Sequence, residues 1–185
     1  FKHFPSLTVT LDDFALKGSA PYKNDTLVAA KDVSFGINLK NLIFDGNINI
    51  DEIYVSKGLI NVKVNEKGQA NYNVYILDKE ETSKDTTGTS IRLERIDIRN
   101  VALKYHDISA KVNLEAKGFN YLGKGNLDQS IFDLYTEAKI ESLDFAFDGE
   151  KYLENKKIDA DLITKINTNS LSFVFQQNDL RINKL

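Results

Sequence analysis

Apolar and polar residues alternate with a period of two along most of this 185-residue chain. Clear runs span residues 33–39, 60–64, 110–116 and 171–175. Successive side chains of a strand point to opposite faces, so such alternation is typical of antiparallel strands with one buried side. Stretches with the helical period are nearly absent, and only residues 41–44 and 149–155 are candidates for short helical turns. The alternation therefore predicts an all-β fold.

A longer pattern repeats on top of this alternation. Blocks that begin at Val9, Ile48, Ile91, Ala138 and Leu180 share the spacing apolar-x-apolar-x-x-apolar, and their starts lie 39 to 47 residues apart. Each of the first four blocks slips by one residue at a polar pair: Asp12-Asp13, Asp51-Glu52, Glu94-Arg95 and Glu141-Ser142. The recurrence indicates a repeat array, although any β-rich sequence produces some spacings of this kind by chance.

The slip predicts a particular shape for the sheet. Strict alternation would send the second apolar pair of each block to the other face of the sheet. A β-bulge or sharp bend at the polar pair returns these residues to the same face and adds twist. We therefore expect a long, twisted and bent, mostly antiparallel sheet that forms a groove or an open sandwich, with few short helices.

One polar stretch divides the chain into two parts. Residues 78–90 contain no large apolar side chain, which is typical of a mobile loop. We expect residues 1–77 and 91–185 to be parts of one continuous β-repeat array, because the repeated pattern resumes at Ile91. Two separate domains are the alternative. The last block is cut short at Leu185, so we expect the array to be truncated there.

Composition excludes several classes of function. The chain has 24 Lys and Arg against 27 Asp and Glu. This slightly negative net charge does not indicate binding of nucleic acid or of anionic lipid headgroups. It has no Cys, which excludes disulfides and thiolate metal sites. No apolar run approaches the roughly 18 residues of a membrane-spanning helix. Because the chain starts at Phe1 and contains no Met, we expect it to be a segment of a longer or processed protein.

Catalytic residue combinations are scarce, so we expect no enzyme, no cofactor and no metal site. His3 and His106 are the only histidines. Adjacent strand residues point to opposite faces, so His106 is not expected to bond Asp107 as a catalytic pair. The acidic pairs at the slips are better explained as solvated bend residues. Three of the arginines, Arg92, Arg95 and Arg99, alternate with acidic residues and predict a charge-balanced outer face.

Several segments together resemble the AsmA family of bacterial envelope proteins. The resemblance is carried by Phe4-Pro5-Ser6-Leu7, Leu11-Asp12-Asp13-Phe14, Ala30-Lys31-Asp32-Val33-Ser34-Phe35, Gly46-Asn47-Ile48-Asn49-Ile50, Ile60-Asn61-Val62, Gly68-Gln69-Ala70-Asn71-Tyr72, Arg95-Ile96-Asp97-Ile98-Arg99-Asn100 and Leu103-Lys104-Tyr105-His106-Asp107. The resemblance covers about the first 110 residues well. The rest of the chain shares only the general pattern of the sequence and none of these motifs. Tyr72 departs from the pattern, because family members often carry Trp there.

The resemblance implies a location and a role. It implies a helix in the bacterial inner membrane just before Phe1, with the rest of the chain in the periplasm. It also places the chain near the repeating β-groove superfamily, whose members are thought to carry lipids between membranes along a hydrophobic trough. The expected function is therefore non-covalent binding or transport of phospholipid or another lipid, in outer-membrane biogenesis or lipid homeostasis.

An uncovered apolar face can be used in two ways. If it stays open, acyl chains would lie along a row that contains Val9, Leu11, Ile48, Ile50, Ile91 and Leu93. If the sheet closes on itself as a sandwich or barrel, these are ordinary core residues. The main alternative function is a structural or protein-interaction β-repeat scaffold in the cell envelope, with unknown protein partners. A glycan-binding β-sandwich is less favoured, because the aromatic residues are scattered.

Overall fold

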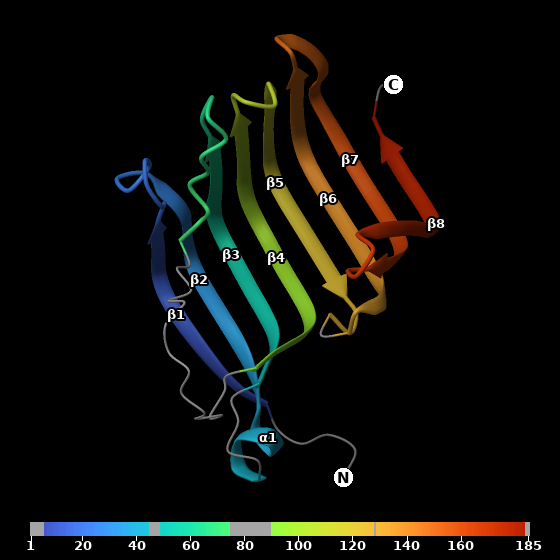
Figure 1. The fold of residues 1–185 in the computed structure, drawn as a ribbon. Helices are drawn as coiled ribbons and strands as arrows, with labels where there is room; N and C mark the ends of the chain where they lie inside the picture. Colours follow the sequence, from blue (N-terminus) through green and yellow to red (C-terminus); the bar gives the residue numbers. More distant parts are fainter. Residues whose placement is uncertain (1–5, 45–48, 75–89, 128, 184–185) are drawn as a thin grey trace.

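A single sheet of eight strands makes up almost the whole fold. The structure, a computed structural model, describes residues 6–44, 49–74, 90–127 and 129–183, without the side chains of residues 6, 40 and 90–92. The elements are β1 (Ser6–Lys17), β2 (Thr26–Asn38), α1 (Leu39–Phe44), β3 (Asn49–Val64), β4 (Ser90–Asp107), β5 (Val112–Lys124), β6 (Ile131–Phe147), β7 (Glu150–Asn167) and β8 (Ser172–Ile182). The strands lie side by side in chain order, with β1 and β8 at the two edges (Figure 1). The predicted all-β, open sheet is confirmed.

All neighbouring strands are antiparallel except β3 and β4, which are parallel. Their register places Ile53 beside Ile96 and Val55 beside Ile98. The second and third repeat blocks therefore lie in line with each other. Residues 78–89 of the expected loop lie outside the described residues, and Ser90 already begins β4. Because β3 pairs with β4, strands from both parts of the chain belong to one sheet.

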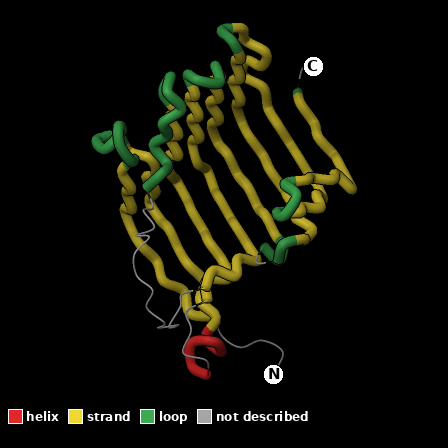
Figure 2. Tube along the Cα trace, in the orientation of Figure 1, coloured by secondary structure: helices red, strands yellow, loops and turns green. Residues whose placement is uncertain are grey.

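Of the two predicted helical turns, one is present and one is wrong. Residues 41–44 belong to α1 at one end of the sheet (Figure 2), where the Asn38 side chain accepts a hydrogen bond from the Asn41 amide at 3.2 Å. Residues 150–155 instead form the start of β7. The reason lies in Asp148 and Gly149, whose positive φ angles of 51° and 83° make a two-residue hairpin turn.

Three of the four slips predicted at the polar pairs are confirmed as shifts of register. Gly36 pairs with Glu52 and Ile37 with Ile50, so Asp51 is an extra residue in β3. The register also shifts between Ile91 and Arg95 in β4, and between Ile140 and Leu143 in β6. In the first block Asp13 has a φ of 52° with no shift of register against β2.

A line of left-handed residues also crosses the sheet, and the sequence did not predict it as a whole. Lys57 and Asn100 have φ angles of 50°, and Gly118 has a φ of 60°. By the register Asp13, Lys57 and Asn100 lie at one level across β1, β3 and β4, and Gly118 on β5 lies two residues further along. The alternation of apolar residues resets at this level on each of these strands. Apolar positions therefore stay on one face along the full length of the strands.

The segment after β3 folds back and extends the sheet at one end (Figure 1). Asn71 is fully buried there, and its side-chain amide accepts a hydrogen bond from the Lys63 amide at 2.9 Å and donates one to the Asn61 carbonyl at 2.7 Å. Its own carbonyl accepts a hydrogen bond from the Ser19 amide at 2.8 Å. Asn71 thus ties the end of β3 to the loop between β1 and β2.

Candidate functional site

The register aligns residues from all eight strands into one cross-sheet row. The row consists of Leu11, Val33, Val55, Ile98, Tyr121, Ala138, Ala160 and Leu180. Residues directly opposite each other on neighbouring strands share a face of the sheet. We call the face that carries this row the apolar face.

Further rows of apolar residues lie on either side of the first. One row contains Val9, Phe35, Ile53 and Ile96, and another contains Leu16, Val28, Ile60, Leu103, Ala116 and Leu143. The apolar face therefore extends along the strands as well as across them.

The opposite face is polar over most of its area. One residue away from the apolar row, the register aligns Thr10, Ser34, Tyr54, Asp97, Leu122, Glu137, Asp161 and Asp179. We call this side the polar face. The contrast between the two rows accounts for the period-two pattern of the sequence.

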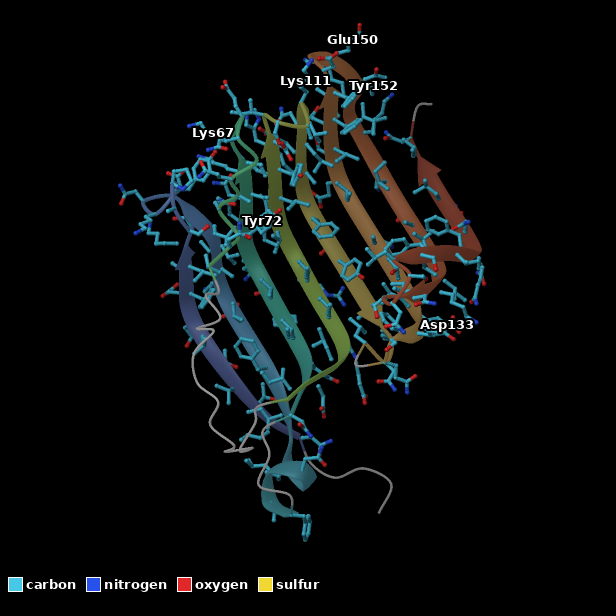
Figure 3. All side chains as sticks on the ribbon, in the orientation of Figure 1. Lys67, Tyr72, Lys111, Asp133, Glu150 and Tyr152 are labelled. Atoms are coloured by element: carbon cyan, nitrogen blue, oxygen red, sulfur yellow. The ribbon has the colours of Figure 1, made fainter. Side chains whose placement is uncertain are left out.

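No described element forms a second layer on the apolar face (Figure 3). Contacts between the described elements run almost entirely between neighbouring strands and between α1 and β2. Few described apolar side chains are buried: Leu27, Ala30, Val33, Val64, Ala70, Val101, Ala116 and Ile158. The chain exposes 12982 Å², whereas a compact protein of its mass exposes about 9,000 Å². Within the described residues, this is a single-layer sheet with one open apolar side.

The predicted lining residues on β1 and β3 take their places on the apolar face. Val9 and Leu11 lie on the edge strand β1, opposite Phe35 and Val33, and each side chain is 40% exposed. Ile50 pairs with Ile37 of β2 in a neighbouring row.

The other predicted lining residues are only partly described. Ile48 lies outside the described residues. The backbone of Ile91 pairs with that of Ile50, but the Ile91 side chain lies outside the described part. Leu93 is half-buried in the bulged segment of β4, where its carbonyl accepts a hydrogen bond from the Leu127 amide at 3.1 Å.

The prediction missed the contribution of β5, β6 and β7. Phe119 and Tyr121 lie on the apolar face of β5, with ring centroids 6.0 Å apart, and Phe145 lies on β6 opposite Leu114. The alternation of residues 110–116 could have revealed part of this region. The apolar positions after Gly118 could not be recognised in the same way, because the period-two alternation is interrupted at Gly118.

At the end of β4, polar groups on the apolar side are bonded to one another. Asp107 is buried and accepts hydrogen bonds from the Ser109 hydroxyl at 2.6 Å, the Ala110 amide at 2.8 Å and the Tyr105 hydroxyl at 3.0 Å. These bonds, led by that of Ser109, lower the pKa of Asp107. The His106 ring lies 3.3 Å from the Asn113 side-chain oxygen, so the prediction that it does not pair with Asp107 is confirmed.

The polar face carries internally balanced charges. Asp97 is buried between Arg99, which donates to it at 2.5 and 3.1 Å, and Arg95, which donates at 3.1 Å. Burial alone would raise the pKa of Asp97, but the hydrogen bonds from Arg99 and Arg95 outweigh it, and the pKa is lowered. The predicted charge-balanced face is confirmed for these two arginines, and the Arg92 side chain lies outside the described residues.

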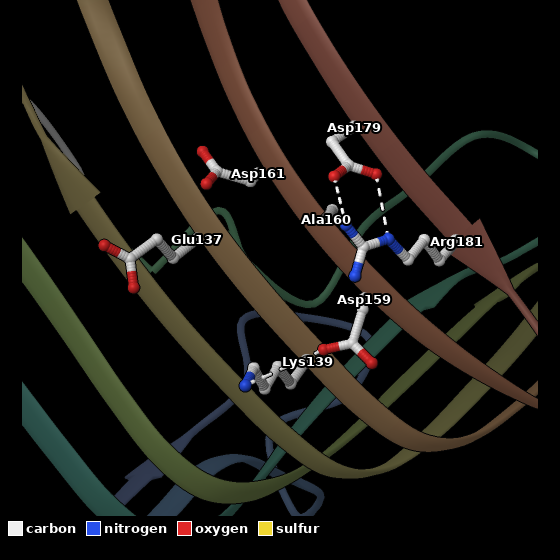
Figure 4. A pocket seen from close by; sticks show the side chains of 7 residues that line it. All are labelled: Glu137, Lys139, Asp159, Ala160, Asp161, Asp179 and Arg181. Atoms are coloured by element: carbon white, nitrogen blue, oxygen red, sulfur yellow. Dashed lines mark hydrogen bonds and ion pairs between the residues drawn. The ribbon is translucent and has the colours of Figure 1, made fainter.

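The side chains of β6, β7 and β8 outline a shallow hollow on the polar face (Figure 4). Its lining is mostly charged: Glu137, Lys139, Asp159, Asp161, Asp179 and Arg181, together with Ala160. Arg181 pairs with Asp179, and Lys139 lies 3.8 Å from Asp159. Among the described residues no three His, Asp or Glu side chains are placed to hold a metal ion. This lining does not suit an acyl chain.

Comparisons with models of protein families, with curated proteins and with solved structures find no match to this chain. None of the helical residues that the structure describes forms a segment long and apolar enough to cross a membrane.

Proposed function

We propose that the apolar face binds the acyl chains of lipids without covalent chemistry. In this proposal the chain is a periplasmic part of an AsmA-like protein, anchored in the bacterial inner membrane, and it serves lipid transport in outer-membrane biogenesis or lipid homeostasis. The observation that carries the proposal is the row of apolar residues that crosses all eight strands and that no other described element covers. Binding rather than catalysis fits a face on which apolar side chains form continuous rows across the strands.

The dimensions of the sheet suit acyl chains. The 18 residues of β4 span about 60 Å at roughly 3.3 Å per residue. Eight strands at about 4.8 Å spacing make a face about 34 Å wide. Each Å² of apolar surface removed from water contributes about 25 cal/mol. A face lined mainly by aliphatic and aromatic groups holds tails without fixing their position, so lipids would slide along it with little discrimination between headgroups.

Photo-crosslinking from two tyrosines tests the proposal with little change in shape. Tyr121 lies on the apolar face and Tyr54 on the polar face. Each is replaced by p-benzoyl-phenylalanine, and the full chain is irradiated with phosphatidylcholine or phosphatidylglycerol vesicles. We expect lipid adducts, read by mass spectrometry, at position 121 and not at position 54. Equal labelling at both positions, or none at position 121 in a folded protein, would remove the apolar face from the proposal.

Native mass spectrometry of protein purified without detergent gives a second readout. Bound phospholipid at a defined stoichiometry is the expected result. Substitution of Ile50 by Asp should abolish retention, whereas substitution of the exposed Glu52, two residues along on the same strand, by Asp should leave it unchanged. A lipid-free monomer whose stability is unaffected by lipid would favour the alternative.

The alternative is a scaffold that binds proteins through its sheet edges. It is favoured by β8, which among the described residues pairs only with β7 and whose side chains are exposed almost throughout. Such an edge accepts an added strand through its free backbone groups. The two functions separate experimentally, because a scaffold would show no lipid adduct at position 121.

A further inference from the structure

Three hydroxyl groups interrupt the apolar face over β5, β6 and β7. They belong to Tyr121 of β5, Thr136 of β6 and Thr164 of β7, and we call them the hydroxyl patch. Gly123 of β5 lies directly opposite Thr136, and a Cβ atom built on Gly123 would lie 2.6 Å from the Tyr121 hydroxyl oxygen. The Tyr121 ring therefore lies over Gly123, which places its hydroxyl near Thr136.

Thr164 lies one row further along the same face. Leu162 of β7 is directly opposite Thr136. Thr164 is two residues on from Leu162, on the same side of the sheet and opposite Leu134 of β6. Diagonal neighbours of this kind on adjacent strands lie about 7 to 8 Å apart. One ligand can therefore contact the hydroxyls of Thr136 and Thr164 together.

The protein itself does not use the hydroxyls of the patch. None of the three makes a hydrogen bond with another described residue. Thr164 is only 8% exposed, yet no fully enclosed side-chain oxygen among the described residues lacks a partner. The Thr164 hydroxyl therefore reaches the surface of the apolar face. By contrast, the Tyr105 hydroxyl near the end of β4 is bonded to Asp107 at 3.0 Å.

A ligand that covers the patch must bring hydrogen-bond acceptors of its own. Hydroxyl groups that lose water without gaining a partner raise the free energy of the complex, so a bare hydrocarbon chain is disfavoured at this place. A carboxylate or phosphate is also disfavoured, because the apolar-face rows around the patch carry no charged side chain to pair with it. Neutral carbonyl oxygens meet both conditions.

We propose that the hydroxyl patch binds the ester carbonyl groups of a diacyl glycerolipid. In such a lipid two neutral esters join the tails to glycerol, so both carbonyls lie at the polar end of the tails. The proposal rests on the proposed lipid binding and adds to it the class of lipid and a preferred position along the sheet. The headgroup takes no part in this contact.

The face beyond the patch has room for the tails. From Thr136 to Phe147 β6 advances eleven residues, about 36 Å at roughly 3.3 Å per residue. The tails of one leaflet occupy only about 15 Å, half of the roughly 30 Å hydrocarbon core of a bilayer. The apolar-face residues on this path are Ala138, Ile140, Leu143 and Phe145. A lipid whose esters lie at the patch can therefore keep both tails on the apolar face.

Ester and ether lipids of the same chain length separate this contact from tail binding. The full chain is incubated with vesicles that contain equal amounts of dioleoyl phosphatidylcholine and of its ether analogue, in which methylene groups replace the two carbonyls. The protein is then separated from the vesicles, and mass spectrometry gives the ratio of the two bound lipids. One neutral hydrogen bond changes affinity by roughly 2- to 10-fold, so we expect about a tenfold preference for the ester.

Substitutions that keep the shape of the side chain test which hydroxyls are responsible. Thr136→Val and Thr164→Val retain the β-branched side chain. Together they should lower the preference for the ester at least threefold, roughly the effect of one or two hydrogen bonds, and leave the total lipid bound unchanged. Thr10→Val, on the polar face, is the matched control and should leave the preference unchanged. Tyr121→Phe should also lower the preference, whereas Tyr54→Phe, on the polar face, should not.

Each other result overturns the proposal. Equal binding of ester and ether lipids by the wild-type chain excludes the contact with the carbonyls, while the proposed lipid binding stands. A preference that survives both valine substitutions, or that Thr10→Val abolishes, assigns the contact to another place. If the folded protein binds neither lipid, the proposed lipid binding fails and the patch fails with it.

Dioleoylglycerol distinguishes the esters from the headgroup. It carries the same two esters and no phosphate, so the wild-type chain should prefer it over its own ether analogue by a similar factor. A preference seen only with phosphatidylcholine would assign the contact to the headgroup and contradict the proposal.

Discussion

Substitution of Asn71 by Ala should destabilise the protein strongly for a residue outside the strands. Asn71 is fully buried, and its side chain pairs with the Lys63 amide and the Asn61 carbonyl at 2.9 and 2.7 Å. Alanine would leave both backbone groups without a partner at a buried position. At about 1 to 2 kcal/mol for each group, the free energy of unfolding should fall by about 2 to 4 kcal/mol.

Urea denaturation followed by circular dichroism measures this change. The slope of the unfolding free energy against urea concentration is expected to stay the same. Asn73 lies two residues further on and is exposed, which makes Asn73→Ala the matched control with a change within about 0.5 kcal/mol. A cost for Asn71→Ala as small as that of the control would refute the account. It would mean that water reaches these backbone groups and that the segment after β3 does not stabilise the sheet.

Three further predictions follow from the sheet itself. The pKa of Asp97 is lowered in the folded state. Its contribution to stability is therefore present above its ordinary pKa of about 3.9 and is lost as the pH falls through the lower, folded-state pKa. Thermal melting at several pH values should show this loss of stability, and D97N should make the loss smaller. Asn100 has a φ of 50°, so Asn100→Gly should be nearly neutral and Asn100→Val should cost about 1 to 2 kcal/mol in urea denaturation; equal stability of the two variants would contradict the left-handed backbone. Val101 is 1% exposed, so Val101→Ala should cost about 2 kcal/mol, against about 0.5 kcal/mol or less for the exposed Val174→Ala; similar costs would mean that Val101 is not enclosed.

The sequence predicted the class of the fold because each strand carries its own alternation. It also predicted the bulge at Asp51 and the irregularity at Asp13, where the slip of the pattern falls beside polar residues. It did not predict the parallel pairing of β3 with β4, because side-chain alternation is the same for parallel and antiparallel neighbours. That pairing depends on how the chain returns between the strands, which the local pattern does not encode.

The candidate site was predicted in part for a similar reason. The repeat blocks identified apolar positions such as Leu11 and Val55, and the register places these two in one row. Tyr121 and Ala160 belong to the same row but fall outside the blocks, so only the register identifies them. The role of Asn71 depends on hydrogen bonds between segments far apart in the chain, which periodicity cannot reveal.

The strand order, in which every strand neighbours only the strands next to it in the chain, has a consequence for how the protein comes apart. Removing β8 breaks one strand pairing and leaves the other six pairings intact. Stability in such an array is close to a sum over adjacent pairs. Unfolding should therefore begin at the two edges and proceed inward, and backbone amides of β4 and β5 should exchange with solvent last.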